Sequence, residues 1–271
     1  MDAFPFLLKR WRALRRLTQE QLAFEAQTST RHLSCLENGK SNPSRPMVLS
    51  LARALELTLR ERNTLLGSAG FAPEFPASEL ASPLLAPVNR AVDLLLAQQE
   101  PFGAVLLDRA WNVLRANRGA GHLLEAFLDG EGREPHIATN LVRATLHPAG
   151  LRPWIVNWPA VAALAMDRLE RELAHFPLDA ERAALLAEVK MYPDVGALPS
   201  AAPSPDASIA QVHLRRGQAD LRVFSLLSTI GTPLDVTAQE LSVELFFPVD
   251  DATTQWFVSK RASDAEGSSK A

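Results

Sequence analysis

The sequence lacks the features that mark secreted and membrane-embedded proteins. It has one cysteine in 271 residues, so no disulfide can form within the chain, which agrees with a reducing compartment. No apolar run approaches the roughly 18–20 residues that a membrane-spanning helix requires. The N-terminus, MDAFPFLLKRWR, has neither a full-length apolar signal region nor a cleavage site. We therefore expect a cytoplasmic protein that does not enter a membrane.

The motifs of the common enzyme classes are also missing. The sequence contains no GxSxG nucleophile turn and no GxxxxGK[ST] phosphate-binding loop. Six scattered histidines and one cysteine give no zinc-binding spacing. The segment GAGHLL, which begins at Gly119, departs from the GxGxxG pattern at Leu124. Because no nucleophile, metal site or cofactor site is predicted, we expect no enzymatic activity, no catalytic residue, no metal and no cofactor.

Charge is divided unevenly along the chain. Residues 1–70 hold 11 Lys or Arg against 6 Asp or Glu, whereas the other residues hold 17 against 25. The net charge of −3 therefore combines a basic N-terminal part with an acidic remainder. A basic module favours a polyanionic partner such as nucleic acid, although an uneven scatter of surface charge would give the same count.

Residues 1–70 show five short helical patterns and little else. Thr18 with Gln21 is the capping-box pattern of a helix start, Ser29 can cap the next helix, and the pair Asn38-Gly39 ends that helix in a turn. A compact all-α domain is therefore predicted over residues 1–70. Its apolar positions recur at helical spacing in five groups: Phe6, Leu7, Trp11, Leu14 and Leu17; Leu22, Ala23 and Ala26; Leu33 and Leu36; Val48, Leu51, Ala52 and Leu55; Leu65 and Leu66.

The pattern changes after residue 70. Residues 71–86 hold three prolines and several small residues, which predicts an extended linker. Residues 87–258 mix helical runs with a hairpin around Asp108-Arg109 and three strands in IAQVHLRR, DLRVFSLLSTI and ELSVELFFPVD. This mixture predicts an α+β domain with an antiparallel sheet and covering helices. A loop is expected over residues 193–208 and a disordered tail over residues 259–271.

The stretch TQEQLAFEAQTSTRHLSCLENGK, residues 18–40, predicts two helices that could dock on DNA. If Leu33 and Leu36 face the core, helical geometry turns the small and hydrogen-bonding side chains of the second helix outward. A helix of this size fits the major groove, where such side chains meet base edges. The predicted base contacts are Thr30, Arg31, Ser34 and Cys35, with Ser29 at the cap and with Gln19, Asn38 and Lys40 near the phosphates.

The segments TQEQLA, STRHLSCLENGKSNPS and LARALELTLRERNTLL together resemble the helix-turn-helix of the XRE family, the Cro and phage-repressor type, over roughly residues 6–70. The resemblance implies a phosphate contact at Gln19 and base-facing positions at Thr30, Arg31 and Cys35. Gln27 stands where the family usually has glycine, and a positive φ there costs a polar residue little. Cys35 stands where relatives often have Arg or Gln, which leaves open the base that it reads.

Residues 88–250 resemble the MmyB-like regulators, whose C-terminal ligand-binding domain has a PAS-like fold. The likeness rests on Trp111-Asn112-Val113, Ala116-Asn117 and Leu146-His147-Pro148 followed by Trp158. It implies an apolar cavity for a long-chain, fatty-acid-like ligand, although apolar residues at helical spacing are also typical of an ordinary core. The expected ligand contacts are Phe127, Leu128, Leu141, Leu146, Trp154, Trp158 and Leu164, with Arg143, His147 or Arg152 to hold a carboxylate.

These patterns together predict a one-component transcriptional regulator. Its helix-turn-helix domain would bind double-stranded operator DNA as a homodimer, and its PAS-like domain would bind a small apolar effector. The alternative is a protein-binding adaptor that uses the basic helical domain without specific DNA recognition. The position of Cys35 near Arg31, in the N-terminal half of a helix, also allows a redox switch on DNA binding.

Overall fold

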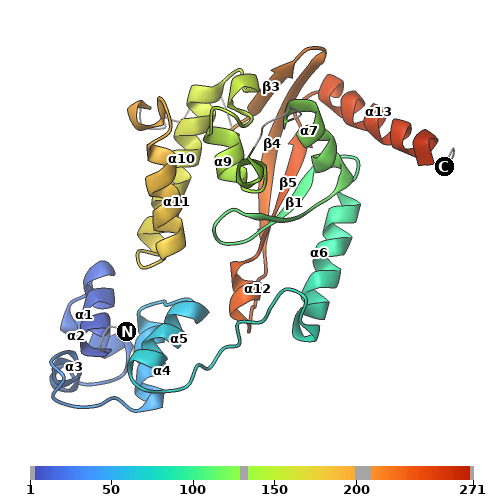
Figure 1. Cartoon of the computed structure of the whole chain (residues 1–271). Coiled ribbons are helices and arrows are strands. Elements are labelled where there is room, and N and C mark those ends of the chain that lie inside the picture. The colour runs from blue at the N-terminus through green and yellow to red at the C-terminus, as the bar shows by residue number, and fades with distance from the viewer. Residues whose placement is uncertain (1–3, 129–133, 199–208, 269–271) are drawn as a thin grey trace. The chain divides into compact units, whose positions relative to one another are not determined.

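The structure is a computed structural model that describes residues 4–128, 134–198 and 209–268 (Figure 1). These residues fall into two units. The first unit contains the chain as far as Ala86 together with Gly231–Gln239, and the second contains Pro87–Ile230 and the chain from Glu240 onward. The chain therefore enters the first unit twice, once from its N-terminus and again at Gly231.

Five helices form most of the first unit, as the sequence predicts. Thr18 and Gln21 make the predicted capping box at the start of the second helix, and Ser29 accepts a hydrogen bond from the backbone N–H of His32 at the start of the third. Gly39 follows the third helix at a φ of 67°, in the left-handed region. The helices are α1 (Phe4–Leu14), α2 (Gln19–Glu25), α3 (Thr30–Glu37), α4 (Arg45–Ala54) and α5 (Leu59–Ser68).

The predicted core of this unit is confirmed in α2 to α5 and partly wrong in α1. Every apolar position predicted from Leu22 to Leu66 is buried. In α1, however, Phe6 is 57% exposed and Leu14 is 42% exposed. Because α1 begins at Phe4, its inward face follows the spacing i, i+3, i+4 and i+7 from that residue. The buried side chains of α1 are therefore Phe4, Leu7, Leu8 and Trp11.

A buried ion pair joins the first three helices. Nε and Nη2 of Arg12 donate to the two carboxylate oxygens of Glu37 at 2.5 and 2.9 Å, and Nε2 of Gln19 donates to the same carboxylate at 2.7 Å. The Glu37 side chain is fully buried. Burial alone would raise the pKa of Glu37, but the hydrogen bonds from Arg12 and Gln19 outweigh this effect and hold the pKa below its usual value.

The segment Gly231–Gln239 packs within the first unit, and we call it the docked insert. It contains most of the short helix α12 (Val236–Glu240). The backbone N–H of Val236 donates to the carbonyl of Pro76 at 2.8 Å. The backbone N–H of Leu59, at the start of α5, donates to Oε1 of Gln239, also at 2.8 Å. One backbone hydrogen bond and one backbone-to-side-chain hydrogen bond therefore hold the docked insert to the helical domain.

Asp235 is the main polar anchor of the docked insert. Its side chain is buried, and one carboxylate oxygen accepts the backbone N–H of Ser78 at 3.1 Å. The other oxygen accepts the N–H groups of Thr237 and Ala238 at 2.8 and 3.2 Å, which caps α12. Asp235 therefore both starts the short helix and attaches it to the segment that follows α5.

The second unit is built around an antiparallel sheet with the strand order β2-β1-β5-β4-β3. The strands are β1 (Ala104–Leu107), β2 (Val113–Ala116), β3 (Val212–Arg216), β4 (Ala219–Thr229) and β5 (Ser242–Pro248). The predicted hairpin at Asp108-Arg109 and the three predicted C-terminal strands are confirmed. The docked insert lies in the connection between β4 and β5.

The sheet is covered on both faces at β1, which is buried along its whole length, whereas the second half of β4 is exposed. The helix α13 contacts β4, β5 and α7, and α7 also contacts β1. Elsewhere α10 packs against α9 and α11 (Figure 1). The predicted α+β, PAS-like architecture is confirmed. The elements are α6 (Ala86–Gln98), α7 (Arg118–Leu128), α8 (Pro135–Ala138), α9 (Leu141–Leu146), α10 (Trp158–His175), α11 (Ala180–Lys190) and α13 (Asp251–Ser268), with short 3-10 turns η1 (Pro83–Leu85), η2 (Arg152–Trp154) and η3 (Val195–Ala197).

The C-terminal tail differs from the prediction. Residues 259–271 are expected to be disordered, but α13 continues as far as Ser268. The helix starts where Asp250 accepts the backbone N–H of Thr253 at 2.8 Å, and no proline interrupts it afterwards. Residues 269–271 lie outside the described residues, as do residues 199–208 of the predicted loop 193–208.

The predicted linker, residues 71–86, is held to the helical domain near its start. The side chain of Asn63 in α5 donates to the carbonyl of Phe75 and accepts the backbone N–H groups of Glu74 and Phe75. The segment contains no α-helix or strand before the 3-10 turn η1 (Pro83–Leu85), where its predicted extended form ends, and its first part is attached to α5. Within the described ranges, no helix is both long and apolar enough to cross a membrane.

Removing the carboxylate of Glu37 should loosen the helical domain. The variant Glu37→Ala leaves the guanidinium of Arg12 buried without its partner, which costs about 3 kcal/mol for pairs of this kind. We therefore expect the amides of α2 and α3 to exchange faster by about two orders of magnitude in native-state hydrogen exchange. Acid should act in the same direction: the pKa of Glu37 is lowered in the folded state, so its contribution is present above pH 4–5 and is lost as the pH falls through the folded pKa.

The matched control for this variant is Arg12→Met combined with Glu37→Leu. Replacing both charged partners by apolar side chains removes the pair without leaving a buried charge, so much of the stability should return. Exchange rates in Glu37→Ala that equal those of the unmodified protein would show that the ion pair contributes nothing to the domain.

Candidate functional site

The outward face of α3 is the candidate DNA interface. Leu33 and Leu36 are fully buried. The predicted base-contacting side chains therefore lie on the opposite side of the helix, where Thr30 and Arg31 are exposed and Ser34 and Cys35 are half-buried. This face combines a guanidinium, two hydroxyls and a small thiol, which is the chemistry that base edges in the major groove can meet.

The predicted phosphate contacts lie around the ends of this face. Lys40 is exposed in the turn after α3. Gln19, the first residue of α2, donates to the buried carboxylate of Glu37, so the ion pair fixes the orientation of its amide. The exposed Asn38 donates its side-chain amide to the carbonyl of Ser34 at 2.7 Å and so caps α3 from within.

The turn between α2 and α3 has the backbone that the sequence predicts. Gln27 adopts a φ of 55° there, which confirms the expected positive value at this non-glycine position. Ser29 is exposed at the cap of α3, where its hydroxyl oxygen accepts a backbone N–H and its own O–H can still donate.

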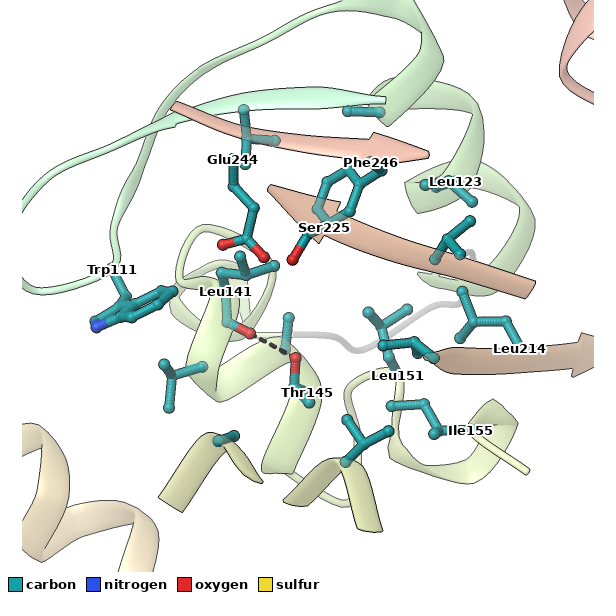
Figure 2. Close-up of a pocket in the computed structure, with 18 of the residues that line it drawn as sticks. Trp111, Leu123, Leu141, Thr145, Leu151, Ile155, Leu214, Ser225, Glu244 and Phe246 are labelled. Atoms are coloured by element: carbon teal, nitrogen blue, oxygen red, sulfur yellow. Dashed lines mark hydrogen bonds between the residues drawn. The ribbon is translucent and has the colours of Figure 1, made fainter. Parts of the chain in front are cut away.

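An apolar cavity of about 240 Å³ lies between the sheet and the helices α7, α9 and α10 of the second unit. An apolar cavity of roughly 150 Å³ admits a benzene-sized molecule, so this one has room for a longer apolar group. Figure 2 shows the wall from within, and much of it is aliphatic. Its apolar side chains include Leu123, Leu141, Leu151, Ile155, Leu214 and Phe246.

Trp111 is brought to the cavity by a strained turn between β1 and β2. Its φ of 66° lies in the left-handed region, which a bulky side chain rarely adopts at a cost of roughly 1–3 kcal/mol. Asp108 supports the turn by accepting the backbone N–H groups of Ala110 and Asn112 at 2.8 and 2.9 Å. The indole Nε1 of Trp111 donates to Oε2 of Glu172 in α10 at 3.1 Å.

Few polar side chains face the cavity, and two of these are already engaged. The hydroxyl of Thr145 donates to the carbonyl of Leu141 at 2.8 Å. The guanidinium of Arg168 lies 4.1 Å from the ring centre of Trp111, and its Nε is 3.4 Å from Oε1 of Glu172. The polar side chains on the wall are Thr145, Arg168, Gln211, Ser225 and Glu244.

Glu244 is the most buried of these polar groups, with 7% of its surface exposed. Alternate residues of β5 point to one face of the sheet, so Glu244 and Phe246 face the cavity together, next to Ser225 of β4 (Figure 2). Burial raises the pKa of Glu244, and the charge of Glu172 adds to the rise, while Ser225 and Arg168 oppose it. The carboxyl therefore favours its neutral form.

The ten predicted ligand contacts divide between the cavity and its surroundings. Leu141 and Leu164 line the cavity. The other apolar positions lie elsewhere in the fold: Phe127, Leu128 and Leu146 are buried in the core, Trp154 packs under the guanidinium of Arg216, and Trp158 donates its indole N–H to the carbonyl of Thr145.

The predicted carboxylate-binding groups lie outside the cavity wall and have other partners. Arg143 pairs with Glu188 at 2.8 and 2.7 Å and, through these hydrogen bonds, lowers the pKa of Glu188 to about 2. Arg152 pairs with Asp194 at 2.5 Å, and His147 packs edge-on against Tyr192. The structure thus leaves these three groups, Arg143, His147 and Arg152, away from an occupant of the cavity.

Sequence reasoning missed the polar groups of the cavity, Arg168, Ser225 and Glu244. A signal for Glu244 exists, because the run ELSVELFFPVD places a carboxylate inside an apolar strand, where a charge is costly. Arg168 sits on an amphipathic helix and Ser225 on a mixed strand, so neither differs from an ordinary surface residue. Among the described residues, no cluster of His, Cys, Asp or Glu could hold a metal ion.

Known proteins share both parts of this chain. Residues 8–62 match the family model "Helix-turn-helix", and residues 88–258 match "MmyB-like transcription regulator ligand binding domain". No curated protein matches the chain. A similar solved structure, "Structure of an RNA-binding Light-Oxygen-Voltage Receptor", is 11% identical over 94% of this chain, which spans 62% of that chain, with a TM-score of 0.24, too low to support an argument. The family models confirm the predicted resemblances, and the chain belongs to the MmyB-like transcription regulators, with an XRE-type helix-turn-helix at its N-terminus.

Proposed function

We propose that the protein is a one-component regulator that binds specific operator sequences with an affinity set by an apolar ligand. One observation carries the proposal: the same chain presents an exposed helix face suited to base edges and an apolar cavity whose two wall strands, β4 and β5, are joined by the docked insert. A family of DNA-binding transcription regulators with a ligand-binding domain supports the same function.

The proposed base-contacting surface is the N-terminal half of α3. The exposed guanidinium of Arg31 suits a bidentate contact with guanine, and the hydroxyls of Thr30 and Ser34 suit either kind of base pair. Cys35 is limited to a compact contact, such as one with a thymine methyl group. Lys40 would contact a phosphate, which would position α3 on the DNA without reading the base sequence.

We propose that two copies bind together. Helix-turn-helix proteins read half-sites about one DNA turn, roughly 34–36 Å, apart, so the spacing of two recognition helices decides operator affinity. A ligand can change this spacing only if it binds one arrangement more tightly than the other. The effector would therefore act by favouring one geometry of the dimer.

The covalent path from the cavity to the helical domain supports this coupling. Ser225 lies on β4 and Glu244 on β5, and both face the cavity. Between these strands the chain forms the docked insert, which Asp235 attaches to the backbone of Ser78. A movement of β4 or β5 on ligand binding would therefore be passed to a segment that is bonded to the start of α5 and to the chain that follows α5.

Removing either of two exposed basic side chains should change DNA binding, but in different ways. Arg31→Ala should lower the preference for operator over unrelated DNA by about tenfold or more, because a bidentate base contact contributes roughly 1–3 kcal/mol. Lys40→Ala should weaken binding to every duplex alike and reduce the slope of log affinity against log salt by about 1. Fluorescence anisotropy with fragments of the regulator's own upstream region, at several salt concentrations, measures both.

The unmodified protein sets the control for these titrations. If it binds every sequence equally weakly and salt abolishes the binding, phosphate contacts alone are present and the protein-binding adaptor becomes the better explanation. A footprint that protects a single half-site would contradict the proposed dimer.

Filling the cavity should block the effector. Ala165 lines the cavity from α10, so Ala165→Phe places a ring in the space and should weaken binding of dodecanoic acid or 1-dodecanol at least tenfold in calorimetry. Ala160 is exposed on the same helix, and Ala160→Phe is the matched control with an expected change below about twofold. Mass spectrometry of lipids that co-purify with the unmodified protein would identify the natural ligand. Equal affinities in the two variants would remove the cavity as the effector site.

Weakening the attachment of the docked insert should uncouple ligand binding from DNA binding. Asp235→Ala removes the acceptor for three backbone N–H groups, whereas Leu234→Ala changes an exposed side chain of the same insert and serves as the control. Coupling between sites is typically worth 5–150-fold in affinity. We expect a C12 amphiphile to change operator affinity in the control and to change it by less than about twofold in Asp235→Ala. Undiminished coupling in Asp235→Ala would exclude the docked insert as the route.

A further inference from the structure

The cavity contains a carboxyl group with one oxygen that has no hydrogen-bond partner among the described residues. Oε2 of Glu244 is buried, and within the described residues it has no hydrogen-bond partner. Buried polar atoms in folded proteins are nearly always paired, so an unpaired one that faces a cavity is open to a partner that the chain does not supply. Figure 2 shows the carboxyl group of Glu244 pointing into the cavity beside the hydroxyl of Ser225.

No cation neutralises this carboxyl group. Among the described residues, no Lys, Arg or His forms an ion pair with Glu244, and the guanidinium on the cavity wall, Arg168, lies over Trp111 and pairs with Glu172. A carboxylate buried without an ion-pair partner is costly, so burial favours the neutral acid. A neutral carboxylic acid offers one O–H donor and a carbonyl acceptor.

These two observations limit the chemistry of the ligand's polar end. A hydroxyl or primary amide can donate to one oxygen of Glu244 and accept its O–H. A carboxylate anion would bring an uncompensated negative charge into this buried wall, near the charge of Glu172 and with Arg168 already engaged. The far side of the cavity, around Leu151, Ile155 and Leu214, is apolar and suits a hydrocarbon chain (Figure 2).

We propose that Glu244 selects the effector by binding the hydroxyl or amide end of an uncharged amphiphile whose hydrocarbon chain fills the rest of the cavity. This inference rests on the proposed role of the cavity as the effector site, and it changes the expected ligand from a fatty-acid anion to a neutral relative of it.

Calorimetry on the full chain with 1-dodecanol, dodecanoate and dodecylamine at neutral pH tests the selection. We expect 1-dodecanol to bind at least tenfold more tightly than either charged compound. Glu244→Gln keeps an uncharged donor and acceptor and should stay within about threefold of the unmodified protein for 1-dodecanol. Glu244→Leu should lose at least tenfold for this alcohol. Thr145→Val is the matched control, because the Thr145 hydroxyl also lies on the wall but bonds to the backbone of Leu141.

The outcomes separate this inference from the proposed function. Dodecanoate or dodecylamine binding as tightly as 1-dodecanol would overturn the role of Glu244 and leave the cavity as an apolar effector site. No binding of any of the three by the unmodified protein would overturn the effector site itself. If Glu244→Leu fails to fold, infrared difference spectra of the unmodified protein against Glu244→Gln replace it: a protonated carboxyl band that shifts with 1-dodecanol supports the inference, and its absence overturns it.

Discussion

The pairing of β4 with β5 is the constraint on which the cavity and the docked insert both depend. The register places Ser225 opposite Phe246 and Leu227 opposite Glu244, so a ladder of backbone hydrogen bonds brings the polar groups of the cavity wall together. The same ladder ends at Thr229 and Ser242, on either side of the connection that holds the docked insert. Because side chains alternate along a strand, a shift of one residue would turn Glu244 away from the cavity.

Two buried glutamates show how the surroundings of a carboxyl group raise or lower its pKa. Glu37 receives hydrogen bonds from Arg12 and Gln19, so its pKa is lowered and its charge fixes three helices to one another. Glu244 is buried without an ion-pair partner, so its pKa is raised. The first glutamate is part of the framework. The second keeps one buried oxygen, Oε2, without a hydrogen-bond partner among the described residues.

The sequence predicts those parts of the fold that depend on local chemistry. The capping box at Thr18, the turn at Gln27 and the strand run around Val243 are all read correctly, because caps, turns and alternation act over a few residues. The cavity depends on side chains brought together from distant strands and helices, and the sequence therefore predicts Arg143 and Arg152 as ligand contacts although Glu188 and Asp194 bind them. An ion pair of this kind leaves no periodic signal along the chain.

The unpaired Oε2 atom of Glu244 also explains how the binding of an amphiphile could bias a two-state equilibrium. A buried polar atom without a partner costs roughly 1–3 kcal/mol, and this cost falls on the ligand-free form. A ligand that supplies the missing hydrogen bond removes this cost only in arrangements of the domain in which its polar end reaches Glu244. Its affinity therefore differs between arrangements, which is the requirement for a shift in population. An apolar residue at this position would stabilise the empty domain and reduce that difference.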